Sequence, residues 1–291
     1  MFQGNFVATV TPFRNGAVDE KALGGLLERL IQDGVQGFVP CGTTGESATL
    51  THEEHDRVIS LTIEVARKRV PVLAGTGSNS TAEAIRLTHH AKQAGADGAL
   101  MITPYYNKPT QEGIFRHFET VAAAVDLPIV VYNIQGRTAV NIEPTTMERL
   151  SQVKGIVGVK EASGNLGQVS EVIERCGPAF DVLSGDDNLT LPIVALGGKG
   201  VISASANLLP TEMTAISDAA RAGDYPKSRE VHYRIAPLLR AIFVETNPVP
   251  VKTALAILGR IPSDEVRLPL APMTAANREK LVQALAAAGL S

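Results

Sequence analysis

Short apolar segments alternate with longer amphipathic segments through the first 208 residues of this 291-residue chain. Eight of the apolar segments have the length and composition of buried strands, at residues 6–10, 37–39, 72–74, 98–102, 129–132, 156–160, 182–184 and 200–203. Helical segments separate them, at residues 20–32, 53–67, 81–94, 111–125, 144–150, 166–175 and 189–196. Because parallel strands need long crossover connections, eight strand–helix units in this order predict an α/β fold, a (β/α)₈ TIM barrel.

The alternation stops after about residue 208, and the remaining chain is predicted to be helical at residues 211–222, 227–245, 248–259 and 275–288. We therefore expect a barrel at residues 1–208 that carries the active site. A helical extension at residues 209–291 would pack on it to make one structural unit. A doubly wound open sheet is the alternative, but the loop at residues 75–79 lacks the third glycine of a dinucleotide fingerprint and has no Walker lysine.

Two helix starts carry capping signals. Thr51 precedes Glu53 and Glu54, and Ser80 stands three residues before Glu83. A hydroxyl followed three residues later by a carboxylate is typical of a capping box, in which both side chains bind backbone N–H groups. We expect such a box at residues 80–83.

Composition excludes several classes of function. The net charge of −3 argues against a nucleic-acid-binding surface. No run of about 18 apolar residues predicts a membrane span, and residues 1–11 do not resemble a secretory signal. Two cysteines, Cys41 and Cys176, cannot form a disulfide framework. A cytoplasmic protein is expected.

Lys160 ends a buried strand with a charge, at the end where α/β barrels place their ligands. Burial disfavours the ammonium form of a lysine. The free amine is a nucleophile whose natural target is a carbonyl group. Most lysines at strand ends point into water, so Lys160 alone is weak evidence for catalysis.

Other strand ends carry groups that suit a small anionic substrate. The sequence Gly-Thr-Thr-Gly-Glu at 42–46 offers backbone N–H groups and two hydroxyls, which fit a carboxylate or a phosphate. A tight turn with polar filler is the alternative. Three of the five tyrosines follow two neighbouring strands, and a supported tyrosine hydroxyl can carry a proton. Arg137 could hold a second carboxylate.

The sequence His-Glu-Glu-His at 52–55 does not have the spacing of a zinc-protease helix, because its histidines are three residues apart instead of four. No third ligand is evident. No metal site is predicted.

Four motifs stand in order along the chain: the loop at 42–46, Tyr132 followed by Asn133, Gly-Val-Lys-Glu at 158–161, and Asn-Pro-Val-Pro-Val-Lys at 247–252. Together they resemble the dihydrodipicolinate synthase family of pyruvate-dependent class I aldolases and lyases. The resemblance covers essentially the whole chain. It implies a carbon–oxygen lyase that condenses pyruvate with L-aspartate-4-semialdehyde to 4-hydroxy-tetrahydrodipicolinate in the diaminopimelate route to lysine.

By this resemblance, Lys160 forms an imine with pyruvate, and no other cofactor is used. Thr43 and Thr44 hold the pyruvate carboxylate. Tyr132 is the acid–base beside the lysine and forms a proton relay with Thr44 and Tyr106. Tyr106 comes from a neighbouring subunit of a homotetramer, a dimer of dimers. Two further residues, Gly185 and Ile202, lie near the lysine and the bound substrate.

The loop that carries Arg137 distinguishes members of the superfamily. Its Gly-Arg-Thr ending resembles the synthases, in which the arginine binds the carboxylate of aspartate semialdehyde. The synthases commonly have proline where this chain has Gln135, and the loop is less stiff without it. Gln135 therefore weakens the assignment of the aldehyde.

A second set of residues resembles the feedback site for L-lysine of many bacterial synthases: Ser47, Ala48, Leu50, His52, His55, Asn79, Glu83 and Tyr105. Histidines and a carboxylate can bind the two charged ends of an amino acid, although polar side chains on surface helices are common. Lysine inhibition is therefore expected.

Two alternatives remain. One keeps the imine chemistry with another aldehyde, as in sugar-acid, hydroxy-oxo-acid or N-acetylneuraminate lyases. The other is a lysine-binding barrel without catalysis.

Overall fold

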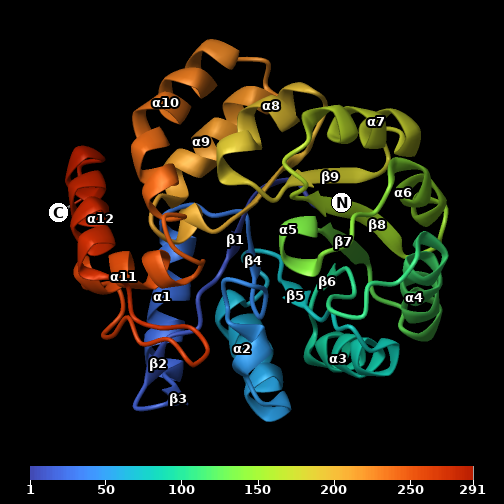
Figure 1. Cartoon of the computed structure of the whole chain (residues 1–291), viewed down its shortest axis with the longest axis horizontal. Coiled ribbons are helices and arrows are strands. Elements are labelled where there is room, and N and C mark those ends of the chain that lie inside the picture. The colour runs from blue at the N-terminus through green and yellow to red at the C-terminus, as the bar shows by residue number, and fades with distance from the viewer. Residues whose placement is uncertain (291) are drawn as a thin grey trace.

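The eight predicted strands form one parallel sheet that curls into a nearly closed barrel (Figure 1). The computed structural model describes residues 1–290. The barrel strands are β1 (Gly4–Ala8), β4 (Gly37–Val39), β5 (Leu73–Gly75), β6 (Gly98–Ile102), β7 (Ile129–Asn133), β8 (Ile156–Glu161), β9 (Asp181–Ser184) and β10 (Gly200–Ser203). Their hydrogen-bonded order is β4-β1-β10-β9-β8-β7-β6-β5, and a bridge between Phe38 and Val72 brings the two ends of the sheet together. The predicted (β/α)₈ fold is confirmed.

Helices surround the barrel, one after each strand (Figure 1). They are α1 (Glu20–Gln32), α2 (His52–Ala66), α3 (Thr81–Ala94), α4 (Gln111–Ala124), α6 (Pro144–Ser151), α7 (Leu166–Cys176), α8 (Thr190–Ala195) and α9 (Pro210–Arg221). Within residues 1–290, no helix is long and apolar enough to cross a membrane.

Three further helices form a C-terminal helical part on one side of the barrel (Figure 1). They are α10 (Tyr225–Ala241), α11 (Val249–Ile257) and α12 (Ala275–Ala287), and α10 packs against α9 and α12. The division at residue 208 stays a prediction. Because α9 contacts β1 and β10, the eighth helix of the ring begins just beyond that point.

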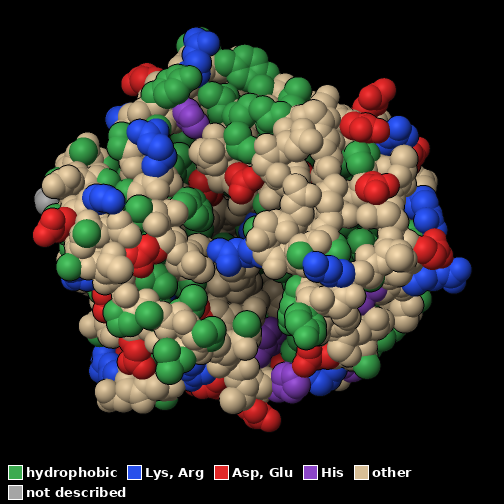
Figure 2. Space-filling model, viewed as in Figure 1, with side chains coloured by type: hydrophobic (Ala, Val, Ile, Leu, Met, Phe, Trp, Pro, Cys, Tyr) green, Lys and Arg blue, Asp and Glu red, His purple; other side chains and the backbone are tan. Residues whose placement is uncertain are grey.

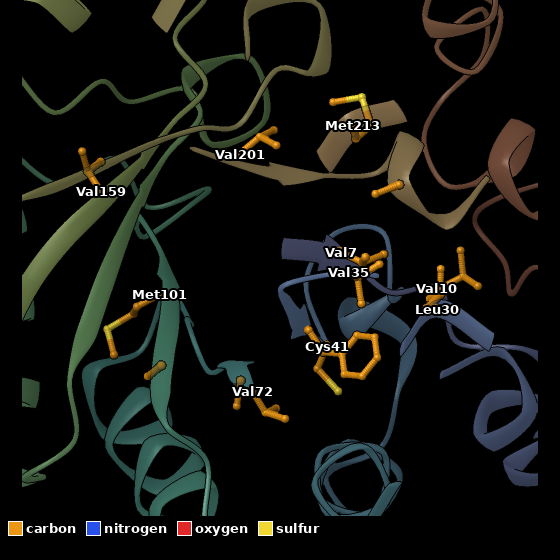
Figure 3. Close-up of a cluster of buried hydrophobic side chains, with 14 of the residues drawn as sticks. Val7, Val10, Leu30, Val35, Cys41, Val72, Met101, Val159, Val201 and Met213 are labelled. Carbon is orange, nitrogen blue, oxygen red and sulfur yellow. The ribbon is translucent and has the colours of Figure 1, made fainter. Parts of the chain in front are cut away.

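Alternating side chains along each strand build two apolar layers. The outer layer lies between sheet and helices and includes Val7, Val159 and Val201, as Figure 3 shows. The inner layer fills the barrel and includes Phe6, Tyr132 and Ile202. Since side chains of a strand point to opposite faces in turn, the outward position of Val159 sends the next residue, Lys160, toward the barrel interior.

The strand and helix boundaries differ from the prediction by a few residues, as at the first strand. Residues 6–10 were expected there, but β1 runs from Gly4 to Ala8. Gly4 N donates to Lys199 O at 2.9 Å, which starts the strand early. Val10 N instead donates to the side chain of Asn207 at 3.3 Å, which ends its pairing.

The expected capping box at residues 80–83 is wrong. Ser80 is the N-cap residue of α3, but its side chain accepts no capping hydrogen bond. The Glu83 carboxylate binds His52 Nε2 at 2.8 Å and Ser78 Oγ, so it is not free to reach back to Ser80. The box forms at α2, between Thr51 and Glu54.

Several short elements were not predicted from the sequence. A hairpin of β2 (Phe13–Arg14) and β3 (Ala17–Val18) follows β1, and the four-residue helix α5 (Gln135–Thr138) follows β7. Both are too short to show a periodic pattern, which explains why the sequence did not reveal them.

Candidate active site

Lys160 and Tyr132 lie next to each other inside the mouth of the barrel. They are paired residues of the neighbouring strands β8 and β7, and Lys160 Nζ lies 4.2 Å from the centroid of the Tyr132 ring. Lys160 is 6% exposed and Tyr132 is 5% exposed. The pairing of the two strands therefore holds an amine and a phenol together, shielded from bulk water.

Two more residues named from the sequence, Gly185 and Ile202, lie within the barrel. A methyl group at Gly185 would lie 3.1 Å from Lys160 Cε and 2.7 Å from Ala162 Cβ, so only glycine fits there without displacement. Ile202 is buried in the same inner cluster as Tyr132. Gly185 thus forms part of the wall beside Lys160, and Ile202 contributes to the apolar interior of the barrel.

The loop after β4 presents Thr43 and Thr44 at the same end of the barrel. It is tightly folded, since Gly45 N donates to Gly42 O at 3.1 Å. A methyl group on Gly45 would lie 3.0 Å from Cys41 N, so the turn requires glycine. Thr11 Oγ1 donates to Gly45 O at 2.7 Å and ties the loop to the segment after β1. The two threonines are therefore held rigidly.

A cavity of about 450 Å³ opens at this end of the barrel. Thr43, Tyr132 and Arg137 line it, and Figure 2 shows the face of the molecule hollowed near its centre. Basic and acidic side chains surround the hollow, and histidines lie below it in this view. The volume suits small, charged metabolites.

Arg137 lies on α5, at the rim of the cavity. Its side chain is exposed and forms no ion pair within residues 1–290, so the guanidinium is open to a ligand. The backbone around it is ordered by hydrogen bonds from Thr138 N to Ile134 O at 3.1 Å and from Ala139 N to Gln135 O at 2.9 Å. The loop with Gln135 is thus a helical turn.

Most of the residues expected to bind L-lysine line this same cavity: Ser47, Ala48, Leu50, His52, His55, Glu83 and Tyr105. Asn79 does not line it, although its backbone O accepts a hydrogen bond from Asn107 Nδ2 at 2.9 Å. The sequence suggested two separate sites, whereas the structure joins their residues in one continuous cavity.

The ionisable side chains in this part of the cavity differ in their charge at neutral pH. Hydrogen bonds from Ser78 and His52 lower the pKa of the Glu83 carboxyl from its usual value. Burial lowers the pKa of His55 to about 4, which keeps that imidazole neutral at pH 7. Burial also raises the pKa of the Tyr105 phenol. Glu83 is therefore an anion at neutral pH in this part of the cavity.

Tyr106 is not brought to the lysine within this chain. Its side chain is 89% exposed and its φ angle is +71°, an unusual backbone conformation for a tyrosine. It does not line the cavity. An aromatic side chain held this far out in water is suited to contact another molecule.

Several buried polar residues next to the site could not be given a role from the sequence. Glu46 forms an ion pair with Lys252, and Asn247 binds Thr44. Glu161 accepts hydrogen bonds from Asn133 Nδ2 at 3.2 Å and from Ser163 N at 2.8 Å. The sequence contained a signal for the ion pair, because Lys252 is a lone charge in an apolar segment. Its partner Glu46 could not be identified from the sequence, because it is 206 residues away.

Cys41 is not a nucleophile here. It is buried, burial raises the pKa of its thiol far above the usual value, and its Sγ contacts His55 O at 3.6 Å. A buried, protonated thiol of this kind acts as a small apolar packing residue.

A (β/α)₈ barrel with a buried lysine at the end of its sixth strand and a tyrosine beside it defines an enzyme of the barrel lyase class. The comparison with known families specifies it further. Residues 1–288 match the model of the dihydrodipicolinate synthetase family, and the chain belongs to that family.

Similar proteins agree with this membership. The 4-hydroxy-tetrahydrodipicolinate synthase of Syntrophobacter fumaroxidans is 58% identical over 290 residues, covering 100% of each chain. The enzyme class and the family predicted from the sequence are confirmed.

Two solved structures bear on ligands. A dihydrodipicolinate synthase from Acinetobacter baumannii, solved in complex with pyruvate, has a TM-score of 0.98 at 44% identity and covers 100% of both chains. One from Cyanidioschyzon merolae, solved with lysine bound, has a TM-score of 0.97 at 40% identity and covers 100% of this chain and 99% of that one.

Proposed function

We propose that this protein condenses pyruvate with L-aspartate-4-semialdehyde through an imine on Lys160. The observation that carries the proposal is Lys160 itself: a buried amine, 4.2 Å from the Tyr132 ring centroid, inside the barrel mouth. An amine shielded from water, with a phenol beside it, is suited to attack a ketone. The pyruvate complex of the related Acinetobacter enzyme supports pyruvate as the first substrate.

The chemistry balances without a redox partner or a metal. The Lys160 amine adds to C2 of pyruvate and water leaves, which gives an iminium ion. The iminium draws electrons, so a proton leaves C3 and an enamine forms. The enamine carbon attacks the aldehyde. The amino group of the added substrate then displaces Lys160 and closes the ring of 4-hydroxy-tetrahydrodipicolinate.

Thr43 and Thr44 hold the pyruvate carboxylate in this proposal. Tyr132 moves the protons that each step requires, in a relay through Thr44 to Tyr106 of a neighbouring subunit. The outward position of Tyr106 supports a shared site in a homotetramer.

Arg137 binds the carboxylate of the semialdehyde. Its open guanidinium lines the same cavity as Thr43 and Tyr132, which supports this role.

The second candidate for the function is another pyruvate-dependent aldolase of the superfamily. It is favoured only by Gln135, which stands where the synthases commonly have proline. A barrel that binds lysine without turnover is a weaker candidate, because a buried amine is present.

We also propose feedback inhibition by L-lysine and a cytoplasmic location. The lysine-bound Cyanidioschyzon structure supports the first. Seven of the eight expected residues line one cavity, in which Glu83 supplies a negative charge that attracts an ammonium group.

Two experiments test the function. Borohydride with pyruvate should add a stable mass to Lys160 in the native protein and none in Lys160→Ala, as read by peptide mass spectrometry. A panel of aldehydes should then show aspartate semialdehyde as the preferred acceptor. An adduct without this preference would support the second candidate, and the absence of an adduct would remove the imine mechanism.

A further inference from the structure

The segment that enters α11 contacts the loop of Thr43 and Thr44 directly. Asn247 Nδ2 donates a hydrogen bond to Thr44 Oγ1 at 2.9 Å. Both side chains are buried, with Asn247 7% exposed and Thr44 3% exposed. Two residues 203 positions apart therefore meet at the mouth of the barrel.

This contact determines the direction of the Thr44 hydroxyl. A hydroxyl oxygen that accepts a hydrogen bond from an amide keeps its own hydrogen free to donate elsewhere. Within residues 1–290, the other polar atom of this side chain, Asn247 Oδ1, has no hydrogen-bond partner. The amide therefore contacts Thr44 only as a donor, through its N–H group. In a relay of hydroxyl groups, the direction of each O–H decides whether a proton can pass.

A second contact fixes the backbone of the same loop. Lys252 Nζ forms an ion pair with Glu46 Oε1 at 2.7 Å, and both side chains are 0% exposed. The other Glu46 oxygen accepts from Arg267 N at 3.1 Å. Lys252 Nζ and Arg267 Cζ lie 4.2 Å and 4.3 Å from the Phe13 ring centroid. The Glu46 carboxylate is thus satisfied on both oxygens.

The backbone of Glu46 needs this support. Its φ angle is +55°, in the left-handed region that non-glycine residues rarely adopt. Such conformations persist where the surrounding contacts hold them. Glu46 N donates to Thr43 O at 3.1 Å, so the conformation at Glu46 is coupled to the threonines.

We propose that Asn247 is a positioning residue that orients the Thr44 hydroxyl for proton transfer, and that the buried Lys252–Glu46 pair holds the loop on which Thr44 stands. This inference rests on the proposed function. It makes the C-terminal helical part, which lies outside the barrel, a component of the active site.

Asn247→Ala and Asn247→Asp test the orientation. Borohydride trapping of pyruvate at Lys160 should stay within about threefold of the native protein in both variants, because the amine is untouched. The kcat of condensation should fall about tenfold to a hundredfold, since small misplacements at a reacting centre have effects of this size.

The pH dependence of kcat in the two variants distinguishes an effect on the orientation of the Thr44 hydroxyl from a general structural effect. In Asn247→Asp, the ionised form of the new carboxyl can only accept, so Thr44 must turn its hydrogen toward it. The protonated form can donate as the amide does. The kcat of Asn247→Asp, relative to native, should therefore rise as pH falls, whereas that of Asn247→Ala should not. A flat ratio for Asn247→Asp would overturn the orientation role.

Lys252→Met alone would leave a bare buried carboxylate and endanger folding. The double variant Glu46→Gln with Lys252→Met removes both charges at similar volume. It should fold, as judged by circular dichroism, and show a raised KM for pyruvate. A native KM would overturn the role of the pair.

Asn277→Ala, on α12, is the matched control and should leave kcat unchanged. If the native protein traps no pyruvate, the proposed function fails; if it does and Asn247→Ala has native kcat, only this inference fails.

Discussion

Tyr132 and Lys160 are directly paired in the register of β7 and β8, and the lysine nitrogen lies 4.2 Å from the tyrosine ring centroid. A single β-pairing thus places the two groups on which the proposed chemistry depends. The next pair in the register, Asn133 and Glu161, points the opposite way and forms buried hydrogen bonds in the outer layer. Because these contacts join the same two strands, they also stabilise the pairing of Tyr132 with Lys160.

Tyr106→Phe should slow condensation sharply, by about a hundredfold, because it removes a hydroxyl that carries protons. Pyruvate trapping at Lys160 should persist. Tyr225→Phe, at a tyrosine on α10 that is 40% exposed, should have native activity. Turnover assays of the purified variants check this.

A mixing experiment tests whether the site is shared. Lys160→Ala and Tyr106→Phe chains should each be nearly inactive alone. Oligomers that contain both should regain activity, since one of their sites then takes a native lysine and a native tyrosine from different chains. No recovery in verified mixed oligomers would place Tyr106 outside the neighbour's site.

Arg137→Ala should raise the KM for aspartate semialdehyde about tenfold to a hundredfold, because a charged hydrogen-bonding partner of the carboxylate is lost. The KM for pyruvate should change little. Arg149→Ala serves as the control, since Arg149 pairs with Glu112 on the outer surface. Equal effects on both substrates would contradict the assignment of Arg137.

Gln135→Pro should be tolerated. Gln135 is the first residue of α5, where proline costs no helical hydrogen bond. The stiffer chain should raise stability by about 0.4–1 kcal/mol, measured by urea unfolding. A lower KM for aspartate semialdehyde in this variant would show that loop flexibility limits the use of Arg137.

Glu83→Gln should weaken L-lysine binding at least about tenfold, because a neutral amide replaces a carboxylate that attracts the ammonium group. Calorimetric titration with L-lysine measures this, and condensation without lysine should remain within about twofold of native. Glu119→Gln, on α4 and outside the lining of the cavity, is the control. Unchanged lysine affinity would remove Glu83 from the site.

Stability should fall as the pH drops from about 6.5 toward 4, partly through His117. Burial lowers its pKa to about 4, below the unfolded value of about 6.5, so the unfolded chain binds the extra proton in that interval. At about pH 5 this difference removes about 2 kcal/mol. His117→Gln should lose less stability between about pH 7.5 and 5 than native in urea unfolding, whereas exposed His89→Gln should match native.

The sequence was sufficient to predict the order of the elements. Apolar runs of strand length and amphipathic runs of helix length revealed all eight barrel strands, because periodicity is a local property. Lys160 could be recognised for the same reason: a charge at the end of a buried strand is visible in a few residues. The motifs around it indicated the family.

Only the tertiary structure decided what lies beside what. Thr44 and Asn247, and Glu46 and Lys252, are each more than 200 residues apart, and no local pattern connects them. The structure also joined the cavity of Thr43 and Arg137 with that of His52 and Glu83, and showed Tyr106 turned away from its own lysine. The sequence determined the barrel and its lysine, since local hydrophobic patterning specifies elements. Chain folding determined the surroundings of that lysine, since contacts between distant residues arise only when the barrel closes and the C-terminal helices pack on it.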